Sequence, residues 1–190
     1  ITLLGGLNIV GSNNLTLSGN LDGAGGLTKN GAGVLTLTGN NGNTGTTTLN
    51  GGTLVVGSNT ALGAGALNTA DGVTLGTLGT TSLSNAFNLG GNLNLIGNAD
   101  LTLSGLVGGA GGLTKNGTGN LTLLGVNTYT GPTNLNGGTL TVGNDAAIGT
   151  GALNVGAAST LAGTSTFSLA NAINRGALLT LDGSNDITLN

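Results

Sequence analysis

Aspartate is the residue type in this chain with the clearest capacity for catalysis, because two carboxylates held about 5–9.5 Å apart can hydrolyse a glycosidic bond. The chain has 190 residues and no Glu or His. Only Asp182 and Asp186 lie close together in sequence, and no sugar-stacking aromatic residue stands beside them. We therefore expect solvated Asp caps on turns and no catalytic residue. The aspartates are Asp22, Asp71, Asp100, Asp145, Asp182 and Asp186.

Other reactive or ligand-binding groups are scarce. The absence of His and Cys excludes a Ser-His-Asp triad, a thiol nucleophile and a zinc site built from these residues. The turns at 22–26 and 182–186 are the nearest approach to a calcium loop, but a single carboxylate rarely holds Ca²⁺ alone. Lys29 and Lys115 stand at equivalent places in Leu-Thr-Lys-Asn-Gly. We expect two solvated turn lysines, no metal and no cofactor.

Threonine rows raise the possibility of ice binding, which in a β-solenoid requires a flat Thr-x-Thr face repeated in coil after coil. Such triplets occur at 36–38, 44–48 and 128–130. One repeat later Thr38 becomes Leu124 and Thr46 becomes Pro132. The pattern therefore favours an ordinary exposed strand face, where β-branched residues fit well.

One sequence unit occurs slightly more than twice in the chain. GGLTKNGAGVLTLTG at 25–39 returns as GGLTKNGTGNLTLLG at 111–125, and LNGGTL at 49–54 returns at 135–140, both after 86 residues. A fixed period of this kind indicates a repeat architecture. We interpret residues 1–190 as one continuous solenoid segment, an excerpt of a longer chain, with a partial copy at 1–24, a full copy at 25–110 and a near-full copy at 111–190.

Apolar residues alternate with small polar ones in short bursts such as Leu15/Leu17, Leu35/Leu37 and Leu54/Val56. This period of two predicts half-buried strands, and the Asn-Gly pairs between them predict tight turns. The main bursts recur every 19 or 20 residues, which is long for a hairpin and suits a coil. The sequence predicts an all-β fold, a right-handed parallel β-helix with coils of about 19–22 residues. Each repeat would then be four coils, or five shorter ones, with a Leu-filled interior and Asn ladders at the turns.

Three segments resemble the autotransporter-associated β-strand repeat of secreted bacterial passenger regions: residues 25–39, 127–140 and 141–155. The first copy departs from this motif, since residues 40–50 lack the aromatic residue that Tyr129 supplies in the second copy. The resemblance implies an extracellular parallel β-helix at the bacterial cell surface.

Composition narrows the functional classes further. Charged residues make up only 5% of the chain and the net charge is −3, which argues against disorder and against a nucleic-acid surface. No stretch is apolar enough to span a membrane, and the first residues do not resemble a signal peptide. We expect a non-catalytic rod of a secreted surface protein, whose partners are adjoining coils or further copies stacked end to end into a filament. The alternative is an adhesin, or a glycan-binding or ice-binding passenger.

Overall fold

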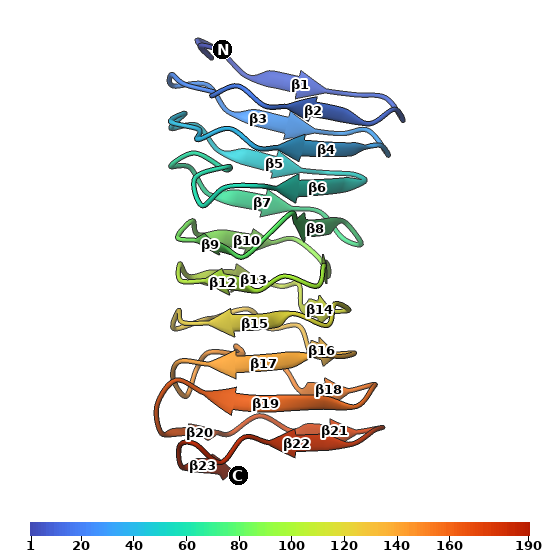
Figure 1. The fold of residues 1–190 in the computed structure, drawn as a ribbon, viewed down its shortest axis with the longest axis vertical. Coiled ribbons are helices and arrows are strands. Elements are labelled where there is room, and N and C mark those ends of the chain that lie inside the picture. Colours follow the sequence, from blue (N-terminus) through green and yellow to red (C-terminus); the bar gives the residue numbers. More distant parts are fainter.

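The rod is built from β-strands alone. The computed structural model describes residues 1–190 and contains 23 strands and no helix, so no helix is present that could cross a membrane. All strand pairs are parallel, and they form three long sheets and one short sheet. Figure 1 shows the coils stacked along one axis, with the two termini at opposite ends. The predicted all-β fold and parallel β-helix are confirmed.

Each long sheet forms one face of the rod. Sheet 1 contains β1 (Leu7–Ile9), β3 (Leu27–Lys29), β5 (Thr47–Leu49), β7 (Leu67–Thr69), β10 (Phe87–Leu89) and β13 (Val107–Gly109). Sheet 2 contains β2 (Leu15–Leu17), β4 (Val34–Leu37), β6 (Thr53–Val56), β8 (Thr74–Thr77), β11 (Leu93–Ile96), β14 (Leu113–Lys115), β16 (Thr133–Leu135), β18 (Leu153–Val155) and β21 (Ile173–Arg175). Sheet 3 contains β9 (Thr81–Leu83), β12 (Leu101–Leu103), β15 (Asn120–Leu123), β17 (Thr139–Val142), β19 (Ser159–Gly163) and β22 (Leu179–Leu181), and the short sheet pairs β20 (Phe167–Leu169) with β23 (Ile187–Leu189).

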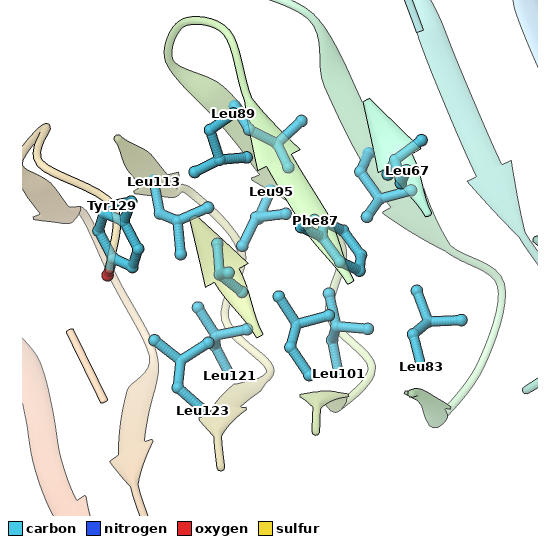
Figure 2. Packing of buried hydrophobic residues seen from close by; sticks show 14 of the residues in the cluster. Leu67, Leu83, Phe87, Leu89, Leu95, Leu101, Leu113, Leu121, Leu123 and Tyr129 are labelled. Atoms are coloured by element: carbon cyan, nitrogen blue, oxygen red, sulfur yellow. The ribbon is translucent and has the colours of Figure 1, made fainter. Parts of the chain in front are cut away.

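The interior follows the alternation of the sequence. In β4, Leu35 and Leu37 are fully buried and Thr36 between them is half-buried on the outer surface. β15 repeats the pattern. Figure 2 shows leucines of several sheets, among them Leu95 and Leu113, packed together inside the rod. Thirty-five buried residues form one continuous cluster, and since apolar burial is the dominant favourable term in folding, this column holds the coils together.

Glycine is required where the chain turns sharply between sheets. After Asn50 and Asn136, the second glycine of each Asn-Gly-Gly turn, Gly52 or Gly138, has a φ of 69° or 67°. No residue other than glycine has a positive φ, in keeping with the steric cost that a Cβ brings in this region. These turns connect a strand of one sheet to a strand of the next sheet.

The repeat does not contain a whole number of coils. Leu27 is followed along sheet 1 by Thr47, Leu67, Phe87 and Val107, at steps of 20 residues. Leu113, the counterpart of Leu27 in the second copy, lies six residues after Val107 and belongs to sheet 2. The second unit therefore begins four whole coils and one face further along the rod than the first unit. Our prediction of four coils, or five shorter ones, is wrong, because the coil of 20 residues does not divide 86.

Candidate functional site

Two lysines lie inside the rod. Lys29 and Lys115 are only 2% and 4% exposed. The Nζ of Lys115 donates hydrogen bonds to the carbonyl oxygens of Gly117, at 2.6 Å, and of Gly137 in the next coil, at 2.9 Å. A buried charge requires such partners, since losing water is costly. The prediction of solvated turn lysines is wrong.

Lys29 repeats this arrangement in the first unit. Its Nζ donates to the carbonyl oxygen of Gly31 and, at 3.2 Å, to that of Gly51 in the next coil. The signal for burial was present in the sequence: Lys29 follows Leu27 by two positions, and alternate side chains of a strand share one face. Residue type suggested a solvated side chain, but strand position placed it inside.

Burial also changes the acid–base behaviour of these lysines. Loss of solvent lowers the pKa of both Lys29 and Lys115 below the ordinary 10.5, because a low dielectric disfavours the charged form. The negative charge of Asp100 partly opposes this effect at Lys115. The two turn carbonyls that accept hydrogen bonds from each Nζ favour its charged form.

Buried asparagines form a second set of interior polar contacts. The side-chain oxygen of Asn127 accepts the N–H of Val107 at 2.8 Å, and its Nδ2 donates to the carbonyl of Ala147 at 2.6 Å. Asn41, its counterpart in the first unit, makes the equivalent two bonds at 2.9 and 2.5 Å. One amide thus links three successive coils.

A third position shows the same repetition. Asn171 donates to the carbonyls of Gly149 and Gly151 at 3.0 and 2.8 Å. Asn85 makes the equivalent bonds in the first unit at 2.9 and 2.7 Å. Sequence reasoning assigned asparagine to the turns and missed this inward role, although both residues follow buried leucines by two positions.

All six aspartates are exposed, and the side chains of four of them accept backbone hydrogen bonds. Asp71, Asp100, Asp145 and Asp182 accept the N–H groups of Asn92, Asn120, Ser168 and Ser184 at 2.7, 2.8, 2.8 and 3.2 Å. No group of three or more acidic side chains converges to form a metal site. Asn14 and Asn59 cap the turns that lie 86 residues before those of Asp100 and Asp145, so an amide performs the same local task as a carboxylate there.

Polar ladders cover parts of the outer surface. At one turn, Asn50 donates to Asn30 at 2.8 Å and Asn30 donates to Asn8 at 2.7 Å. Along sheet 2, amide bonds join Asn174, Asn154 and Asn134 in the same way, each at 2.8 Å. The asparagine ladder predicted for the turns is present between Asn50 and Asn30. The ladder on sheet 2 lies on the outer face of the strands, where none was predicted.

The threonine rows are short. On sheet 1 the outward position is filled in successive coils by Asn8, Thr28, Thr48, Asn68 and Asn88. Threonine therefore continues over only two coils of this row. On sheet 3 threonine continues over three coils, at Thr102, Thr122 and Thr141, between Ser82 and Ala162. Mixed amides and hydroxyls therefore cover sheet 1, and the longest threonine rows lie on sheet 3.

Comparison with known families identifies the repeated segment. Residues 27–56 and 113–142 match the model of the passenger-associated-transport-repeat. The chain carries this repeat twice. Both matches contain the buried lysine, the Asn-Gly-Gly turn above it and the asparagine that links three coils. The resemblance to an autotransporter passenger repeat is thereby confirmed. No curated protein and no solved structure matches the chain.

Proposed function

We propose that this segment is a non-catalytic rod of a secreted bacterial surface protein, which spaces or projects other parts of that protein. The observation that supports this role is the screw relation between the two units. The second unit begins one face further round the coil and repeats the lysine and asparagine contacts of the first, so duplication lengthens the rod without a new type of junction. In a solenoid, stability is close to a sum over coils and their interfaces.

The chemistry of the side chains supports the same role. Lysines and several asparagines are used inside the rod to hold carbonyl groups, and the exposed aspartates cap turns. The repeat itself is one that accompanies passenger transport, which favours a location outside the cell. End-to-end assembly into a filament is the further form of this proposal, in which copies continue the same parallel stacking.

A series of variants of different length tests the proposal that the segment is a rod. Removing residues 25–110 from the native surface protein, or adding a second copy of them, should change its length by about 21 Å, from coils spaced about 4.8 Å apart. Electron microscopy of the isolated protein measures this length, and protease treatment of intact cells tests exposure at the surface.

A matched surface variant distinguishes the rod proposal from the alternative that the segment is an adhesive surface. Replacing Asn134 and Asn154 by Ser leaves the length unchanged and alters the outer row of sheet 2. The rod proposal expects attachment or spacing of cells to follow length and to ignore this variant. If cell attachment or glycan binding is lost in the Ser variant at full length, the segment is an adhesive surface and the proposal is wrong.

A further inference from the structure

Five strands of the rod contain the same triplet, Leu-Thr-Leu, and this identity creates a register problem. The triplets are 15–17, 35–37, 101–103, 121–123 and 179–181. The leucines of the triplets at 35–37, 101–103 and 121–123 are buried in equivalent places, whereas Leu15 and Leu181, in the terminal coils, are 40% and 45% exposed. An alternating apolar pattern fixes which side of a strand faces inward, but it does not distinguish one coil from the next. A coil skipped during folding would still bury leucine on leucine.

Lys115 interrupts such a column. It pairs in sheet 2 with Leu95 in the coil before it and with Leu135 in the coil after it. Its side chain is 4% exposed, and its Nζ contacts carbonyl oxygens where an aliphatic group would need none. Substituting a buried charge by an apolar residue of similar volume is often neutral or stabilising. Stability alone therefore gives no reason for a lysine at this position.

The coil above Lys115 is shaped to receive it. Gly137 supplies the second carbonyl, at 2.9 Å. A Cβ on Gly138 would lie 2.6 Å from the lysine Nζ and 2.6 Å from the carbonyl oxygen of Thr118. Glycine at position 138 leaves this space open. One coil later the corresponding residues are Ala157 and Ala158, and the methyl group of Ala158 would occupy the place that Gly138 leaves free.

We infer that Lys115 and the Gly137-Gly138 turn fix which coil stacks on which. The lysine side chain fits beneath the Gly137-Gly138 turn, but it does not fit beneath the coil that contains Ala157 and Ala158. The first unit has the same lysine and glycine turn on a different face, with Lys29 bonded to Gly51. One coil later, however, the corresponding residues are Asp71 and Gly72, so no methyl group fills the space there. The discrimination between coils therefore lies at Lys115. This role is independent of the proposed function, because it concerns the order of stacking alone.

Cysteine cross-linking can test the inference, because the chain has no cysteine of its own. Asn116 and Asn136 are exposed neighbours in successive coils, joined by a side-chain hydrogen bond of 2.9 Å. An Asn116→Cys/Asn136→Cys pair reports the native register. An Asn116→Cys/Gly156→Cys pair spans two coils, about 9.6 Å, which is beyond the reach of a disulfide. It forms only if one coil is skipped.

The decisive comparison adds Lys115→Met to each cysteine pair, with Leu135→Met as the control in the same column. We expect Lys115→Met to keep or raise the midpoint of chemical denaturation and to produce the two-coil disulfide, which the control does not form. The inference is overturned if Lys115→Met forms only the native disulfide. It is also overturned if Lys115→Met lowers the midpoint sharply or prevents folding, since the lysine would then serve stability.

Discussion

The two repeat units share most of their interior contacts, although equivalent residues lie on different faces of the rod. Lys29 belongs to sheet 1 and Lys115 to sheet 2, yet each bonds the carbonyl of its own turn and that of the next coil. Asn41 and Asn127 agree in the same way. The three faces therefore offer nearly equivalent environments, and a motif brings its contacts with it when it moves to the next face.

One interior position differs between the units. Asn43 in the first unit donates to the carbonyls of Gly25 and Gly45 at 3.4 Å. Its counterpart Tyr129 is fully buried, and its hydroxyl lies 2.6 Å from the Thr133 hydroxyl. Figure 2 shows its ring inside the rod, beside the leucine column.

This difference indicates which parts of the interior are constrained. Gly63 and Gly149 lie above the two side chains, and both have a positive φ, of 68° and 61°. The bare backbone above the slot admits either an amide or an aromatic ring. Positions that satisfy backbone groups of three coils are the same in both units, whereas a position that mainly fills space is free to vary.

The largest expected effect comes from the apolar column. Leu37→Ala should lower the free energy of unfolding by about 2–5 kcal/mol, and Leu123→Ala should match it on the next face. Leu37→Asp should cost more, because it buries an unpaired carboxylate. Chemical denaturation measures these costs. Thr36→Asp, on the outer surface, should change stability by no more than about 0.5 kcal/mol; a cost equal to that of Leu37→Asp would show that the inward and outward positions are wrongly assigned.

The asparagine that links three coils should come next. Asn127→Ala leaves the buried N–H of Val107 without its partner, at a cost of about 1–3 kcal/mol. Asn41→Ala should cost the same within error, since both bonds recur in the first unit. Exposed Asn174 provides the control, and its Ala variant should be close to neutral. Unequal costs at Asn41 and Asn127 would show that the faces are not equivalent.

The variable slot should depend more on the ring than on its hydroxyl. Tyr129→Phe keeps the buried ring and removes the hydrogen bond with Thr133, so we expect a loss of about 0.5–1.5 kcal/mol. Thermal or chemical denaturation will show this loss. A much larger loss would mean that the hydroxyl, and not the packing of the ring, distinguishes the second unit from the first.

The smallest effect should be a rise in stability with pH. Below the lowered pKa of Lys29 and Lys115, the folded and unfolded states are both charged and burial has its full cost. As pH rises through the folded pKa toward 10.5, the folded state releases its protons first, so stability increases. Burial raises the pKa of Tyr129 above its ordinary 10.0, which lowers stability at higher pH.

The pH range from 7 to just below the ordinary 10.0 of tyrosine therefore isolates the lysines. Denaturation of the parent chain over this range should show the rise, and the Lys29→Met/Lys115→Met double variant should show a flat profile. A rise of equal size in the double variant would assign the effect to other groups.

Much of the fold could be predicted because its pattern is local. Alternation at Leu35-Thr36-Leu37 determines the inner and outer sides of a strand, and a spacing of 19–21 residues between such bursts determines the coil. Glycine and asparagine mark the turns, where few other residues fit. The two repeat matches also follow from local sequence. These features depend on neighbours along the chain and on a simple period.

The tertiary structure alone decided the rotation of the units and the environment of the polar interior. The sequence determined a repeat of 86 residues, but the face on which a copy falls depends on the remainder after four whole coils, which only the strand register reveals. In the same way, the sequence shows Lys115 only as a charged residue in a turn motif. Its burial becomes evident only when the next coil is placed on it. Its partner at Gly137 lies 22 residues away, and only stacking brings the two together.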